Sequence, residues 1–236
     1  MARAPGISNH GFVTNPGDGD LDPRAVPARY PGVRGRADAA FPEHADGELW
    51  MRHASDGTTW QIGGSGEVAW IVASTRPDGT IVTATPASFA AHATVIVPDS
   101  DEGKRLADAA LLDVLRGQSP PQPWWLGYLE TGVGDLVFPD APRVRLYTWP
   151  YVLVQAGPDQ AATWRGNDEA LPWHSALPEL MFPLDHSWLV STLWDDDWRC
   201  VGGPESLVDA LLRHPRLEAR AVTLDEDATP PGHDGL

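Results

Sequence analysis

The segment at residues 188–198 constrains the fold of this chain more than any other. An apolar run, Leu-Val-Ser-Thr-Leu, separates Trp188 from Trp194, and three consecutive aspartates then separate Trp194 from Trp198. β-branched and aromatic residues favour strands, whereas adjacent like charges favour a solvated turn. We therefore predict a β-hairpin with an exposed acidic turn, across which Trp194 and Trp198 pair.

Short β-favouring runs recur along the chain and predict a largely antiparallel sheet. Residues 70–75 and 80–85 flank an Asp-Gly pair, which is a strong hairpin signal because Asp-Gly suits the backbone of a tight turn. Gly-rich turns separate the runs that precede this hairpin. The other runs with strand character are residues 49–51, 58–62, 68–72, 124–129, 143–148, 151–155 and 219–224.

Two longer segments have the pattern of α-helices. Residues 99–116 begin with Asp99 as a candidate cap and Glu102 three positions on, carry one apolar stripe and stop at Gly117. Residues 205–214 follow Gly-Gly-Pro and place Leu207 and Leu211 on one face. Residues 158–165 form a third, shorter candidate. We expect an α+β fold with two β-rich halves and two main helices packed on the sheet.

An internal correspondence suggests a duplication. Trp70, Asp78, Pro86 and Ser88 recur as Trp188, Asp196, Pro204 and Ser206, a constant offset of 118 (188 minus 70). A repeated unit of β-hairpin plus helix explains this spacing. Coincidence between two ordinary hairpins is the alternative.

Composition divides the chain into three parts. Residues 1–45 are rich in Pro and Gly without a sustained period, which predicts a flexible leader. Residues 46–224 carry the periodic segments, and we expect a single globular domain there. Residues 225–236 are acidic and interrupted by proline, which predicts a disordered tail.

Charge and cysteine content exclude several classes of function. The formal net charge is -16, so a nucleic acid or an anionic membrane would be repelled. A single cysteine, Cys200, cannot form an intramolecular disulfide or a multi-cysteine zinc site. The N-terminus has no apolar stretch as long as that of a signal peptide, and no later apolar stretch is long enough to span a membrane. We expect a soluble cytoplasmic protein without a cofactor.

The acidic turn is the strongest candidate for a functional surface. Carboxylates flanked by aromatic rings suit the docking of Arg or Lys from a basic protein. We favour a protein-binding module over an enzyme, for example an immunity or antitoxin-type inhibitor of a cationic toxin. The predicted contact residues are Asp195, Asp196, Asp197, Trp194, Trp198 and Trp124.

Two other functions stay open at this point. A small hydrolase or transferase would build its site from carboxylates with Cys200, His174 or His186. Carbohydrate binding would need an exposed ring from Trp124 or Trp125, which face opposite sides if their segment is a strand. The aspartates lack the spacing of a calcium loop, and the Gly-rich segments lack the continuation of a phosphate loop, so we predict no metal site.

Overall fold

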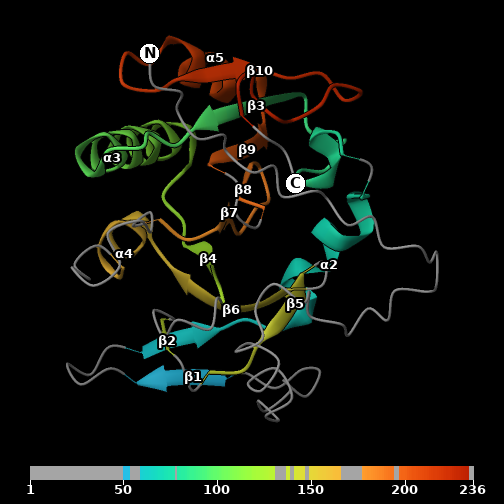
Figure 1. Cartoon of the computed structure of the whole chain (residues 1–236). Helices are drawn as coiled ribbons and strands as arrows, with labels where there is room; N and C mark the ends of the chain where they lie inside the picture. Colours follow the sequence, from blue (N-terminus) through green and yellow to red (C-terminus); the bar gives the residue numbers. More distant parts are fainter. Residues whose placement is uncertain are drawn as a thin grey trace, which may run out of the picture.

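A computed structural model of the chain describes residues 50–53, 59–77, 79–130, 137–138, 141–146, 149–165, 177–193 and 197–233. Its strands form one sheet of ten in the order β1-β2-β6-β4-β7-β8-β9-β3-β10, with β5 paired to β6 (Figure 1). Every pair of neighbours is antiparallel. The predicted α+β class is confirmed. The strands are β1 (Trp50–His53), β2 (Thr59–Ile62), β3 (Ala91–Ile96), β4 (Trp124–Leu129), β5 (Val144–Leu146), β6 (Trp149–Ala156), β7 (Leu180–Pro183), β8 (Leu189–Ser191), β9 (Trp198–Gly203) and β10 (Ala219–Ala221).

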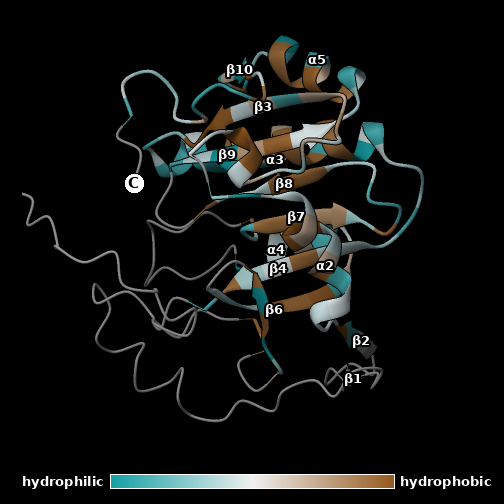
Figure 2. Cartoon of the chain, turned by 90° about the vertical axis from the view of Figure 1, so that its right-hand side faces the viewer, coloured by the Kyte–Doolittle hydropathy of each residue, from teal (hydrophilic) through white to brown (hydrophobic). Residues whose placement is uncertain are grey.

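Helices cover both faces of the sheet. One face packs against α3 (Asp101–Gln118), α4 (Pro158–Thr163) and α5 (Glu205–Arg213), and the other against α2 (Ser65–Ser74) and the 3-10 helix η1 (Ile81–Thr83). Strand residues alternate between the two cores, as Trp124 and Trp125 of β4 do. Figure 2, which looks onto the face that α2 covers, shows that many residues of the central strands are hydrophobic.

The predicted helix at residues 99–116 is confirmed as α3, with different ends. Ser100 is the cap, because its side chain accepts a hydrogen bond from the Gly103 amide at 3.1 Å. Gly117 lies inside the helix, which ends at Gln118. The Ser119 hydroxyl then donates to the Leu115 carbonyl at 2.8 Å, so a polar side chain supplies the stop that we assigned to glycine. The predicted helix at residues 205–214 is confirmed as α5.

The predicted hairpin at residues 70–85 is wrong. Residues Ser65–Ser74 form α2, and Ile81–Thr83 form η1. The Glu67 carboxylate accepts from the Gly64 amide at 2.7 Å, which caps the first turn of α2. Val68 and Ile71 are three residues apart and are both buried, so the apolar run fits one face of a helix. Gly79 has a positive φ of 79°, although Asp78 lies outside the described residues.

The proposed duplication fails for the same reason. Trp70 belongs to a helix, whereas Trp188 directly precedes the strand β8. Pro86 lies in a turn before β3, whereas Pro204 is the N-cap of α5. The two segments therefore share letters without sharing a structural unit.

Two strands were not predicted. β3 reads Ala-His-Ala-Thr-Val-Ile and lies between β9 and β10, inside the sheet. β7 ends in a proline and pairs with both β4 and β8. Short runs with a polar residue or a proline give a weak strand signal, and here the neighbouring strands select the conformation.

The hairpin around the acidic turn is confirmed as β8 and β9. Leu189 lies opposite Gly202, and Ser191 lies opposite Cys200. Trp194, Asp195 and Asp196 lie outside the described residues, so the pairing of Trp194 with Trp198 stays a prediction. The predicted leader at residues 1–45 also lies outside them.

Candidate functional site

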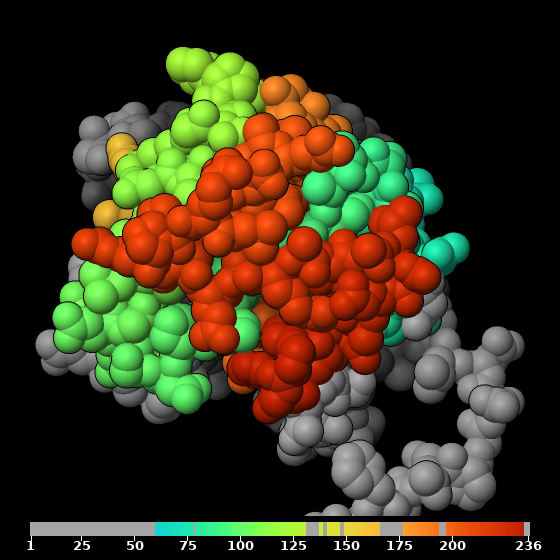
Figure 3. Space-filling model, turned by 90° about the horizontal axis from the view of Figure 1, so that it is seen from above, coloured from blue at the N-terminus to red at the C-terminus, as the bar shows by residue number. Residues whose placement is uncertain are grey.

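The backbones of three segments that carry acidic residues lie side by side at one end of the sheet. The Val97 amide donates to the Asp197 carbonyl at 2.7 Å, and the Ile96 amide donates to the Glu218 carbonyl at 2.9 Å. The start of α3 follows within a few residues of Val97. We call the exposed set the acidic corner; its described members are Asp99, Asp101, Glu102, Asp197 and Glu218. In Figure 3, the green residues of α3 lie beside the red C-terminal part of the chain.

The acidic corner keeps an excess of negative charge after its nearest cations are counted. Lys104 and Arg105 lie one turn further along α3, and Arg216 precedes β10. Asp195 and Asp196 directly precede Asp197 in the sequence, so the predicted contact turn continues into this corner. Repulsion among carboxylates at one place favours a partner that brings positive charge.

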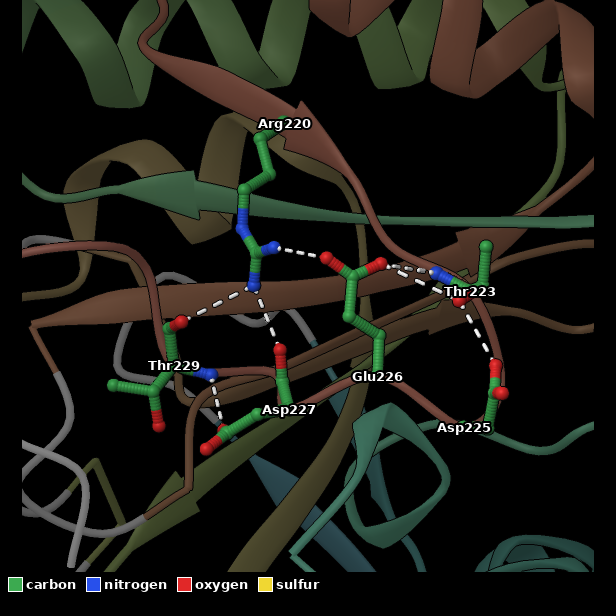
Figure 4. A network of polar contacts seen from close by, with 6 residues as sticks. All are labelled: Arg220, Thr223, Asp225, Glu226, Asp227 and Thr229. Carbon is green, nitrogen blue, oxygen red and sulfur yellow. Dashed lines mark hydrogen bonds and ion pairs between the residues drawn. The ribbon is translucent and has the colours of Figure 1, made fainter.

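The C-terminal segment is fastened next to the corner by Arg220 of β10. Figure 4 shows its guanidinium paired with Glu226 at 2.6 Å and donating to the backbone carbonyls of Asp227 and Thr229 at 2.7 and 3.1 Å. The backbone amide of Thr223, with Arg220 beside it, lowers the pKa of Glu226. The structure thus describes residues 225–233 of the predicted tail as turns held by hydrogen bonds.

One end of this segment touches the acidic turn. The His233 Nδ1 lies 2.8 Å from each oxygen of the Asp197 carboxylate. The His233 ring also lies edge-on to Trp198, with ring centroids 6.0 Å apart. His233 therefore occupies the position on Asp197 that the side chain of a basic partner would take.

Two of the predicted contact residues are buried. Trp124 is 2% exposed and packs edge-on against Trp188, with ring centroids 4.8 Å apart. Trp198 is 4% exposed and packs with Ile81 and Val82 of η1. These rings stabilise the core and offer no contact surface, which corrects their predicted role. Trp125 is buried as well, so neither residue supplies the exposed platform that carbohydrate binding requires.

The structure gives no support to a site built on Cys200. The thiol is buried on β9, where Cys200 lies opposite Thr94 of β3 and Ser191 of β8. His186 lies in the turn before β8 and stacks on Trp70, with ring centroids 4.4 Å apart. His174 lies outside the described residues.

The Asp185-His186-Ser187 run does not form a catalytic triad. Asp185 Oδ1 accepts from the backbone amide of Ser187 at 3.0 Å, which is a local turn contact. Partial burial opposes ionisation of Asp185, but hydrogen bonds from Ser187 and Gln122 outweigh it and lower its pKa. Burial lowers the pKa of His186, which the Asp185 charge only partly offsets. His186 also has a positive φ of 55°, an unusual backbone conformation for a residue other than glycine.

Buried charges at the end of β4 were missed by sequence reasoning. Arg143 pairs with Glu130 at 3.2 Å, and each side chain is 6% exposed. Arg165 pairs with Glu179 and lies 5.0 Å from the centre of the Tyr128 ring. Burial raises the pKa of Tyr128 above its ordinary value, so its hydroxyl stays neutral. No motif links these residues, because the segments that carry them meet only in the fold.

A buried histidine was also missed. His92 of β3 is 5% exposed, and its Nδ1 lies 3.0 Å from Thr85 Oγ1. Burial lowers the pKa of His92, and a hydrogen bond with the Phe89 backbone only partly offsets this. The imidazole is therefore neutral at neutral pH.

This lowered pKa predicts that stability falls with acidification. Below about pH 6.5 the unfolded chain binds a proton on His92 that the folded chain excludes. The free energy of unfolding should therefore fall by up to about 1.4 kcal/mol per pH unit as pH decreases below that point. Urea titrations at about pH 7.5 and about pH 5.5 measure this.

The variant His92→Phe should have a smaller pH dependence than the wild type, whatever its absolute stability. His186 contributes in the same direction, because its pKa is also lowered. His186→Asn serves as the matched control for that second histidine. An unchanged pH dependence in His92→Phe would contradict the assignment of the effect to His92.

Comparisons with known proteins identify no relative: no family model, curated protein or solved structure matches the chain. Among the described residues, none of the helices is both long and apolar enough to cross a membrane. The same residues contain no group of three or more His, Cys, Asp or Glu side chains that could hold a metal ion. The geometry of the chain itself therefore carries the proposal that follows.

Proposed function

We propose that this protein is a binding module whose acidic corner docks a basic protein. The observation that carries the proposal is the meeting of Asp197, Glu218 and the start of α3 at one end of the sheet. Backbone hydrogen bonds fix this meeting, so the charges are pre-positioned before a partner arrives. Pre-positioned complementary charge accelerates association and orients the partner.

The described carboxylates of the corner are exposed, and a basic partner would take the place of His233 at Asp197. Asp195 and Asp196 remain predicted contacts in the same turn. Trp198, next to Asp197, is buried and supports the corner from the core, and Trp124 is buried on β4, so neither ring is proposed to touch the partner. An inhibitor of the immunity or antitoxin type, which covers the cationic surface of a toxin, fits this description.

The first test is affinity capture from a lysate of the source cell with the tagged full-length chain. A corner variant combines Asp101→Asn, Asp197→Asn and Glu218→Gln. A control variant combines Asp113→Asn, Asp159→Asn and Asp209→Asn, which changes the net charge equally at exposed acids outside the corner. We expect the wild type and the control to retain the same basic protein at about 0.05 M salt and to release it at about 0.5 M salt.

The corner variant should bind the purified partner about tenfold more weakly, mainly through a slower association rate. Equal losses in the corner and control variants would indicate a nonspecific effect of net charge and would contradict the proposal. So would a wild-type chain that retains no basic protein at low salt.

A further inference from the structure

The contacts of His92 fix which of its ring nitrogens carries the proton. Nε2 of His92 makes no hydrogen bond, and its Nδ1 lies 3.0 Å from Thr85 Oγ1. Thr85 Oγ1 accepts from Nδ1–H in this contact, because the single proton of the hydroxyl is used elsewhere. The Thr85 hydroxyl donates its own proton to the Ile81 carbonyl at 3.2 Å. Nε2 is left as a buried acceptor without a donor.

A buried donor without an acceptor lies in the same aromatic cluster. The indole Nε1 of Trp70 is buried and makes no hydrogen bond. The Phe89 ring contacts the Trp70 ring at 6.2 Å and the His92 ring at 6.3 Å, edge-on in both cases. One phenyl ring thus lies between an unused donor and an unused acceptor. Such unpaired buried groups are uncommon in folded proteins and call for an explanation.

Phe89 lies at the edge of this cluster, in the turn before β3. Its ring lies directly against the backbone of β9, because a Cβ placed on Gly202 would lie only 2.5 Å from Phe89 Cδ2. Phe89 itself is only partly buried, and its neighbours Ser88 and Ala90 are exposed. Because Phe89 belongs to no strand, a turn of its ring out to solvent would break no strand pairing of the sheet.

We propose that a small planar molecule binds here by taking the place of the Phe89 ring. A carbonyl of the ligand accepts a hydrogen bond from Trp70 Nε1, and an N–H of the ligand donates to His92 Nε2. The ring contacts among Trp70, Phe89 and Phe182 favour an aromatic ligand. The chemical class is a neutral heteroaromatic ring with both a carbonyl and an N–H, as in a pyrimidine base. This site is separate from the acidic corner and does not depend on the proposed docking function.

Uracil is the probe, and dimethyluracil with both ring nitrogens methylated is the matched control ligand. Indole resonances of the ¹⁵N-labelled full chain are followed by NMR, and Trp70→Phe identifies the Trp70 signal by its loss. We expect a saturable shift of that signal with a Kd on the order of 1 mM, as suits a ligand of this size. Dimethyluracil cannot donate to His92, so it should bind about tenfold more weakly.

Two variants test the roles of the protein groups. Phe89→Ala should bind uracil more tightly than the wild type, because the ring no longer competes for the position. His92→Phe should lose most of the preference for uracil over dimethyluracil. Binding to Phe89→Ala without any binding to the wild type would overturn the proposal, since it would reveal only an engineered cavity. Equal affinity of the wild type for the two ligands would overturn it as well.

Discussion

Replacing Asp108 by Ala should destabilise the protein by about 3 kcal/mol, one of the largest effects expected from a single substitution in this chain. Asp108 in α3 accepts a hydrogen bond from Arg199 of β9 at 2.7 Å, and their side chains are 7% and 2% exposed. The substitution takes a carboxylate away from a guanidinium that water cannot reach. In the variant, the Arg199 guanidinium is still removed from water on folding, but the Asp108 carboxylate no longer offsets the free energy that this desolvation costs. Removing one partner therefore destabilises the protein by more than the intact pair stabilises it.

Urea unfolding of matched variants shows whether the loss of stability comes from the buried ion pair or would follow any substitution of an acidic residue in α3. Asp113→Ala removes an exposed acid from the same helix and should change the free energy of unfolding by less than about 0.5 kcal/mol. The double variant Asp108→Leu with Arg199→Met removes both charges and should recover most of the loss. If the double variant is as unstable as Asp108→Ala, the cost lies in packing and the electrostatic account is wrong.

The fold was predictable wherever local signals and burial agreed. α3 and α5 each carry an apolar stripe with helical spacing, and this predicted both helices although the exact cap and stop of α3 differ from those expected. The run from Trp124 to Leu129 has strand character, and both of its faces are buried, one by α3 and the other by α2. Such segments need no information from distant parts of the chain.

The predictions failed where the conformation of a segment depends on the segments that pack against it. Residues 68–72 are apolar and largely β-branched, which favours a strand, yet Val68 and Ile71 form the buried face of a helix. The residue that caps this helix, Glu67, directly precedes the apolar run. β3 carries His92 and Thr94, which look out of place in a strand until the facing residues of β9 and the cover of η1 are known. Sequence patterns report propensity, and tertiary contacts overrode it here.

Some features of the candidate sites could likewise be predicted from the sequence, and others depended on contacts between distant segments. The exposure of Asp197 could be predicted, because three adjacent charges rarely enter a core, whereas Asp195 and Asp196 lie outside the described residues. The convergence of Asp197 with Glu218 and the start of α3 could not be foreseen, since it depends on the pairing of β3 with both β9 and β10. Trp124 and Trp198 were assigned to the surface because tryptophan is common both in cores and at interfaces, and sequence alone does not separate the two.

Truncating Trp188 to Ala should destabilise the chain by about 3–5 kcal/mol. Trp188 is fully buried at the entrance to β8, its ring packs edge-on against Trp124, and its Nε1 donates to Ser119 Oγ at 2.7 Å. One side chain thus joins the hairpin to β4 and to the end of α3. The substitution removes a large apolar area and leaves a cavity that the surrounding strands cannot close, because their register is fixed on both sides.

Two further variants separate the contribution of the Trp188 hydrogen bond from that of apolar packing. The free energy of unfolding of each is measured by urea unfolding. Ser119→Ala leaves the indole donor buried and unpaired, which should cost about 1–3 kcal/mol. Leu184→Ala truncates an apolar side chain in the adjacent turn that is 40% exposed, so it should cost less than about 0.5 kcal/mol. A small effect of Trp188→Ala, close to that of Leu184→Ala, would mean that the hairpin carrying the acidic turn does not depend on this core. A large effect would instead show that the β8–β9 hairpin, whose strand β9 begins directly after Asp197, depends on the packing of Trp188.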